Sequence, residues 1–187
     1  MDSQSLEGKL LIAMPGIGDP RFERAVVLVC NHEPLYAMGM AVNHPIAGVT
    51  VHDLLQRLEV PEPIVVPPDP VLFGGPVDRE RGFVLHTDDY MPEHSAKVMA
   101  GVALSPNRDA LQALAAASGC PRRAMLVLGY AGWGPGQLEE EIRQNVWLTC
   151  DADEDLIFGR DHERKWARAL AKLGVDAALL TAQAGRA

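Results

Sequence analysis

Short apolar runs, each bounded by turn-forming residues, recur along the chain and limit the folds that it can adopt. The runs are rich in Val, Leu and Ile, as buried strands require, and all are shorter than the roughly 18 apolar residues of a membrane-spanning helix. Strands are expected at residues 9–14, 25–30, 38–42, 71–73, 82–87, 98–104, 124–130, 146–149 and 156–158. Many of these strands follow one another without an intervening helix, which favours an α+β fold over a doubly wound parallel one.

Four helices are expected where a capping residue precedes apolar residues at helical spacing. The first follows a capping box at Thr50–Asp53, the second begins after Ser105 and ends at Gly119, and the third covers residues 137–144. The fourth covers about 163–173 and carries an apolar face made of Trp166, Ala169, Leu170 and Leu173. The sequence therefore predicts helices that flank a mixed or largely antiparallel sheet.

The length of 187 residues fits one domain with a substantial core. We expect a single domain over residues 1–187 with an ordered core over about 6–180. Residues 60–70 contain five prolines in eleven residues, which indicates a long loop that crosses the edge of the sheet and does not mark a domain boundary.

The charge balance argues against nucleic acid as a partner. The chain carries 17 Lys and Arg against 25 Asp and Glu, a net charge of −8, which repels phosphate backbones at long range. The three cysteines are widely spaced and odd in number, so neither a fully paired disulfide framework nor a CxxC metal site is expected. With no secretory pattern at the N-terminus and no membrane segment, we expect a cytoplasmic protein.

A glycine-rich segment, residues 129–142, runs from an expected strand through a loop into an expected helix. This layout can cradle an anion, but Gln137 stands where a dinucleotide fingerprint needs glycine, and three glutamates fill the first turns of the helix. A tight turn that docks Trp133 is therefore favoured over a ligand loop. A second element, Phe73–Val77, contains Gly74, Gly75 and Pro76 and is interpreted as a turn at a strand end.

Catalytic and metal-binding patterns are sparse. The six histidines form no HxxxH or HExxH pair, and no GxSxG serine is present, so no metal site and no cofactor is assigned. Cys30 is the best nucleophile candidate because His32 lies two residues further along the same expected strand, where an imidazolium would lower the pKa of the thiol. The alternative, that Cys30 is a small buried hydrophobic residue in an apolar run, is favoured.

Taken in order, the distinctive segments resemble one family along almost the whole chain. They are Met14–Gly16, Asp19–Pro20, Phe22–Arg24, Val26–Cys30 with His32, Ala37–Met40, Asn43, Pro45, Phe73–Val77, Gly82–His86 and Gly129–Ile142. Together they are similar to the bacterial YqgE/AlgH family. The resemblance implies a compact cytoplasmic α+β fold with a curved, partly barrel-like sheet, and no established activity or cofactor. It also implies a link to transcriptional regulation, because the family is described in those terms.

The motif residues carried over by this resemblance are Pro15, Gly16, Arg24, Cys30, Asn43, Pro45, Gly74, Gly75, Pro76, Gly132, Trp133, Gln137 and Glu140. The chain has His44 where the family usually has a lysine, so a role that needs this amine is not expected here.

Our leading hypothesis is a non-enzymatic regulatory or binding protein that contacts an unidentified protein or small molecule. The expected site has the Gly74–Pro76 turn and the Gly132–Gln137 loop at the rim of one cleft, with Arg24 and Asn43 near its floor or edge. The simpler alternative makes both loops structural corners of a bent sheet. The rival functions are a cysteine-dependent enzyme or redox sensor that uses Cys30, and, less favoured, direct binding of DNA.

Overall fold

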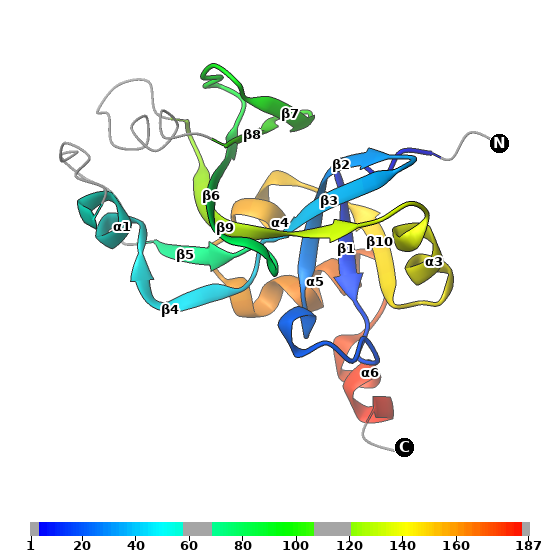
Figure 1. Cartoon of the computed structure of the whole chain (residues 1–187). Helices are drawn as coiled ribbons and strands as arrows, with labels where there is room; N and C mark the ends of the chain where they lie inside the picture. The colour runs from blue at the N-terminus through cyan, green and yellow to red at the C-terminus, as the bar shows by residue number, and fades with distance from the viewer. Residues whose placement is uncertain (1–3, 58–68, 107–120, 185–187) are drawn as a thin grey trace.

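The computed structural model describes residues 4–57, 69–106 and 121–184 (Figure 1). The strands are β1 (Lys9–Ala13), β2 (Val26–Glu33), β3 (Tyr36–Ala41), β4 (Pro45–Thr50), β5 (Pro70–Phe73), β6 (Val77–Thr87), β7 (Ala96–Met99), β8 (Val102–Ser105), β9 (Ala124–Trp133) and β10 (Trp147–Asp151). The helices are α1 (Val51–Arg57), α3 (Gln137–Arg143), α4 (Glu154–Phe158), α5 (Lys165–Lys172) and α6 (Ala177–Ala184), with short 3-10 turns at Pro20–Phe22 and His162–Arg164.

The strands form one mixed, mostly antiparallel sheet. Its order is β10-β1-β2-β3-β9-β6-β8-β7, and β5 adds a parallel pairing with β9 while β4 pairs with β5. The path of the described strands ends at β10 and β7, so the sheet is open, and β6–β8 turn away from β1–β3 (Figure 1). The expected α+β class, with a single domain and a mixed, largely antiparallel sheet, is confirmed.

Strand β9 belongs to both halves of this sheet and crosses the middle of the molecule (Figure 1). Its last residues pair with β3, as Gly132 does with Met38, whereas its first residues pair with β6, as Val127 does with Phe83. Between these two sections Gly129 adopts a φ of 72°, a left-handed conformation that glycine reaches without a steric penalty. Tyr130 still pairs with Val77 of β6 and Ala131 pairs with Gly39 of β3, so the strand changes partners directly after this glycine.

Backbone packs directly on backbone at this change of partners, which we call the glycine junction: Gly74, Gly75 and Gly129. A Cβ atom on Gly75 would lie 2.2 Å from the carbonyl carbon of Tyr130, and one on Gly74 would lie 2.3 Å from the carbonyl oxygen of Gly129. The Gly74 N–H donates to Leu128 O and the Gly74 carbonyl accepts from Ala41 N, both at 2.8 Å. No side chain fits at these positions.

Three apolar clusters surround the sheet. The largest joins one face of β1–β3 and β6 to α4 and α5, and the second joins the other face of β1–β3 to α3. The third lies under α1, beside β4 and β5. Helices thus cover separate parts of the sheet, which leaves parts of β3, β6 and β9 exposed.

Two expected strands are wrong. Residues 156–158 belong to helix α4, where the Asp153 side chain accepts a hydrogen bond from Leu156 N at 2.8 Å and caps the helix. A three-residue apolar run fits a buried helical turn as well as a strand, so periodicity could not separate them. Residues 98–104 form two strands, β7 and β8, because Gly101 turns the chain with a φ of 89°.

Other differences follow from exposure. Strand β4 was not predicted because most of its side chains are exposed or partly exposed, and helix α6 has no strong apolar face. Leu173 was expected in the apolar face of the last helix, but it caps that helix and is 42% exposed.

Two further predictions lie outside the described residues. Ser105 is the last residue of β8, and the helix expected after it lies in residues 107–120. Most of the proline-rich loop also lies outside the described residues.

We expect Trp166→Ala to lower the free energy of unfolding by about 3 to 5 kcal/mol. Trp166 is 5% exposed, and its Nε1 donates to Ala13 O at 2.8 Å, so truncation removes a large buried surface and leaves that carbonyl unpaired. Urea unfolding measures the change. Leu173→Ala on the same segment is the control and should change stability far less; equal effects would contradict the packing described.

Gly75→Ala should destabilise the fold by about 3 kcal/mol or more, because the added Cβ overlaps the backbone of β9. Gly16→Ala is the matched control: a Cβ at Gly16 meets nothing within 4 Å and its φ is not positive, so the change should stay within about 0.5 kcal/mol. Thermal unfolding of both variants tests this difference. Similar melting temperatures for both would show that the glycine junction tolerates a side chain.

Candidate functional site

The structure brings part of the predicted site together at the glycine junction. Phe73 N donates to His44 O at 2.8 Å, so the segment that contains Asn43 and Pro45 runs beside the segment that contains Gly74. Gly75 in turn packs on Tyr130 and Ala131, only a few residues before Trp133. The Gly74–Pro76 turn, which was expected at the rim of a cleft, is therefore packed between two other chain segments, one at His44 and one at Tyr130 and Ala131. Trp133, Gln137 and Glu140 lie beyond this crossing, at the end of β9 and on α3.

Asn43 holds two backbone segments together. Its Oδ1 accepts from Val26 N at 2.9 Å and its Nδ2 donates to Arg24 O at 2.8 Å. Arg24 has a φ of 52°, which is unusual for a residue with a side chain, and the Asn43 amide stabilises that turn. The Arg24 guanidinium lies 5.4 Å from the centre of the Trp166 ring, a cation–π contact. Both residues thus have structural partners.

His44 and Pro45 follow at the start of β4. The His44 ring Nε2 lies 3.1 Å from Glu23 O, and burial lowers the pKa of this histidine. Pro45 is exposed and pairs with Leu72 in the β4–β5 ladder. The residue that replaces the expected lysine of the family is therefore bound to the backbone of the same turn that Asn43 stabilises.

Lys165, which no sequence pattern marked, is completely buried next to Val42, the residue before Asn43. Its Nζ donates to Val42 O and to Ile157 O, both at 2.7 Å, and no described carboxylate bonds to it. Burial, and to a lesser extent the positive charge of Arg168, together lower the pKa of Lys165 from 10.5 to about 7. Nothing in the sequence marks this lysine, because a lysine at a helix start is usually exposed.

His162 lies next to this lysine. Burial and then the charge of Lys165 lower the pKa of His162 to about 4, and its buried Nδ1 has no hydrogen-bond partner among the described residues. Both groups are therefore shifted toward their neutral forms, which is a common property of functional sites but also of buried structural polar groups.

The end of β9 is tied to α3 and β10 by one carboxylate. Glu141 Oε2 accepts from the indole nitrogens of Trp133 at 2.9 Å and Trp147 at 2.8 Å, and Glu141 Oε1 accepts from Gln137 Nε2 at 3.0 Å. Gln137 Oε1 in turn accepts from Gly134 N at 3.0 Å. This geometry is the tight turn that docks Trp133, and Glu141 and Trp147 are partners that sequence reasoning missed.

Glu140 lies on the outer part of the same helix. Its carboxylate pairs with Arg143 Nη2 at 2.7 Å and accepts from Gln144 Nε2 at 2.7 Å. These contacts lie within α3 and its C-cap residue Gln144, and neither of them reaches the glycine junction.

Cys30 and His32 do not form the pair that their spacing suggested. A β-bulge shifts the register of β2 between Val29 and Asn31, and the Cys30 thiol donates to Leu28 O at 3.5 Å. Burial raises the pKa of Cys30 to about 12. The His32 ring Nδ1 accepts from Leu6 N at 3.0 Å and its Nε2 lies 2.6 Å from Glu139 Oε1, so both ring nitrogens are occupied. The geometry does not favour a thiolate.

An exposed surface that we call the β3–β9 platform lies next to the glycine junction. It consists of Tyr36 and Met38 on β3, Tyr130 and Gly132 on β9, and Val77 on β6. Met38 pairs with Gly132 and Val77 pairs with Tyr130, so the registers place these residues on one face of the sheet. Tyr36 is 40% and Val77 37% exposed, whereas Met38 and Tyr130 are partly buried and pack against the largest apolar cluster.

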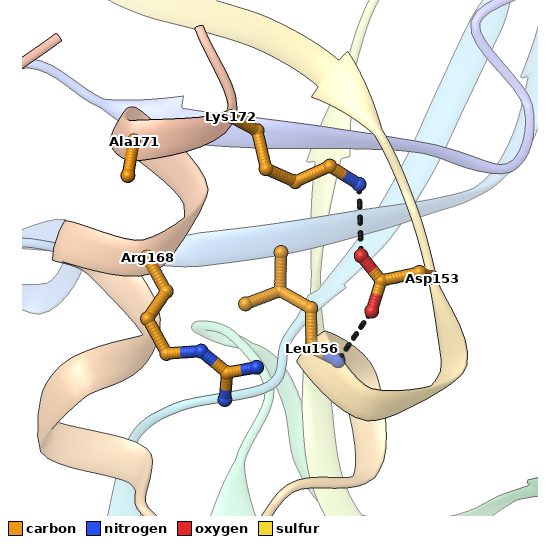
Figure 2. Close-up of a pocket in the computed structure, with 5 residues that line it drawn as sticks. All are labelled: Asp153, Leu156, Arg168, Ala171 and Lys172. Atoms are coloured by element: carbon orange, nitrogen blue, oxygen red, sulfur yellow. Dashed lines mark hydrogen bonds and ion pairs between the residues drawn. The ribbon is translucent and has the colours of Figure 1, made fainter. Parts of the chain in front are cut away.

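A hollow of about 380 Å³ lies between α4 and α5, and none of the predicted site residues lines it. Asp153, Leu156, Arg168, Ala171 and Lys172 line it (Figure 2). Across residues 4–57, 69–106 and 121–184 no group of His, Cys, Asp and Glu is arranged to hold a metal ion. No helix in these ranges is long and apolar enough to cross a membrane.

The protein is a single-domain α+β protein with an open, mostly antiparallel sheet, one strand shared by both halves of the sheet, and helices on separate faces. The sequence pattern of the AlgH-like family matches residues 10–178. The chain belongs to the AlgH-like family.

Relatives support this assignment. A UPF0301 protein of Caulobacter vibrioides is 60% identical over 187 residues, which cover 100% of this chain and 96% of the relative. The solution structure of the AlgH protein from Pseudomonas aeruginosa superposes with a TM-score of 0.76 at 38% identity, over 100% of this chain and 98% of that one. A crystal structure of a Corynebacterium diphtheriae protein shares the fold, with a TM-score of 0.68 at 17% identity over 91% and 93% of the two chains.

The low pKa of Lys165 predicts a pH dependence of stability. Between about pH 7 and 10.5 the unfolded lysine holds a proton that the folded one has lost, so this residue makes stability rise with pH across that window. We expect the stability of the native chain, relative to Lys165→Met, to increase from pH 7 to 10 by at most about 1.4 kcal/mol per pH unit. Urea unfolding at several pH values measures the difference; a flat difference would contradict the shift.

Proposed function

We propose that the protein is a non-enzymatic regulatory protein that binds a protein partner through the β3–β9 platform. The observation that carries this proposal is the environment of Gly132. Gly132 is exposed, its φ is not positive, and a Cβ there would lie 3.9 Å from Tyr130 and 4.0 Å from Val77, which are ordinary contacts. The fold therefore does not require glycine at this position.

This freedom contrasts with the glycine junction, where packing excludes every side chain. A glycine in a strand that packing does not demand leaves the backbone open to close approach by another molecule. Gly132 lies within the distinctive glycine-rich segment and borders the junction, so it is the exposed residue of the predicted site that lies on the platform.

The residues around Gly132 have the chemistry of a protein interface. Tyrosine, methionine and arginine are enriched at such interfaces because they bury much area or combine apolar and hydrogen-bonding contacts. Tyr36, Met38 and Tyr130 supply these contacts on the platform. Beside them Arg81 lies 5.0 Å from the centre of the Phe83 ring and Arg79 lies 5.8 Å from that of Phe73.

The other candidate functions receive less support. The net charge of −8 opposes direct binding of DNA, so a regulatory role in the cytoplasm would act through protein contact. A cysteine-dependent enzyme or redox sensor needs an accessible thiolate, whereas Cys30 is buried with a pKa raised to about 12.

Gly132→Gln should abolish partner binding while the melting temperature stays unchanged, because the longer side chain covers the platform from outside the core. The measurement is chemical-shift mapping of labelled protein in the protein fraction and in the metabolite fraction of a bacterial extract. We expect the amide signals of Tyr36, Met38, Tyr130 and Gly132 to shift in the protein fraction alone, and Gly132→Gln to remove the response.

Gly16→Gln is the matched control, since Gly16 is another exposed glycine with free space around its Cβ position and lies outside the platform. It should retain the full response. A silent platform in the wild type, or an unchanged response in Gly132→Gln, would contradict the proposed function.

A further inference from the structure

Helix α5 carries three cationic residues, Lys165, Arg168 and Lys172, at spacings of three and four residues, which places them along one side of the helix. The two outer residues each make two hydrogen bonds. Lys165 bonds to Val42 O and Ile157 O, and Lys172 bonds to Asp151 O at 2.5 Å and to Asp153 Oδ2 at 2.8 Å. Arg168 alone of the three makes no hydrogen bond or ion pair within the part of the chain that the structure describes.

The unpaired guanidinium of Arg168 borders the hollow between α4 and α5. Figure 2 shows its side chain lying beside Leu156, with Lys172 and Asp153 joined to each other on the far side of that leucine. The second oxygen of Asp153 accepts from Leu156 N at 2.8 Å. Each oxygen of Asp153 thus accepts one bond, the Asp153 charge also attracts the Arg168 guanidinium, and the lining holds two cations against this one anion.

We propose that this hollow binds a small carboxylate that carries a short apolar chain. The planar guanidinium fork of arginine matches a carboxylate in a bidentate geometry, and Lys172 adds positive charge nearby. Leu156 and Ala171 provide the apolar part of the lining. A volume of about 380 Å³ lies at the small end of ligand pockets, which run from about 300 to 1,000 Å³, so the ligand is small.

The site is separate from the β3–β9 platform, so its test is independent of the proposed partner. Sodium butyrate is the probe, titrated into labelled wild-type protein at low ionic strength, where charge-assisted contacts are least screened. The signals of Leu156, Ala171, Lys172 and the Arg168 side chain should shift and saturate. Acetate should bind more weakly because it lacks the chain, and butanol should not bind because it lacks the carboxylate.

Arg168→Gln should weaken butyrate binding by about tenfold or more, because the bidentate charged contact is lost. Arg168→Lys should have an intermediate affinity, since it keeps the charge without the fork. Arg164→Gln is the matched control: Arg164 is exposed one turn earlier and pairs with Asp161 at 3.4 Å, so butyrate binding should not change. Unchanged melting temperatures show that each variant is folded.

The proposal is overturned if butyrate produces no saturable shifts in the wild type, or if Arg168→Gln binds it as the wild type does. It is also overturned if inorganic phosphate binds more tightly than butyrate, because the apolar chain would then contribute nothing. Should Arg168→Gln fail to fold, the comparison of Arg168→Lys with Arg164→Gln decides, and equal affinities would contradict the proposal.

Discussion

The close contact of bare backbone between Gly74–Gly75 and Gly129–Ala131 is the constraint on which the rest of the structure depends. Strand β9 can serve both halves of the sheet only because β5 and the chain after it approach within the distance that a Cβ atom would occupy. The hydrogen bonds of Gly74 to Leu128 and Ala41 then align β3, β5 and β9 at one point. Helices α4 and α5, helix α3, and helix α1 then cover three separate parts of the sheet.

The distinctive residues of the chain divide into two physical groups. The first group makes hydrogen bonds to the backbone or to Glu141 that hold turns in place; it contains Asn43, Trp133 and Gln137. The second group is represented by Gly132, which packing does not require to be glycine and which is exposed beside Tyr130. Distinctive sequence at element junctions therefore marks two different needs: the assembly of the junction, and the surface that remains accessible next to it.

Much of the fold could be predicted from the sequence, because strands such as β2 and β9 have apolar runs long enough to be recognised locally. The helical turn at 156–158 could not, since three apolar residues carry no period, and exposed β4 lacks an apolar run. The contacts of the candidate site were harder to predict than the strands and helices. The roles of Lys165 and Glu141 depend on partners far apart in the chain or on a shared carboxylate, and the glycine contacts join residues more than fifty positions apart. Local patterns do not contain such information.

Lys165 has a consequence for the order in which the molecule can be completed during synthesis. Its Nζ closes the corner at Val42, 123 residues earlier, and Trp166 reaches Ala13, 153 residues earlier, while β1 pairs with β10. When only the first half of the chain has been made, the Val42 carbonyl lacks its lysine donor and one edge of β1 lacks its partner strand β10. Such edges attract other chains, so the N-terminal half is open to wrong pairing until β10 and α5 have been made.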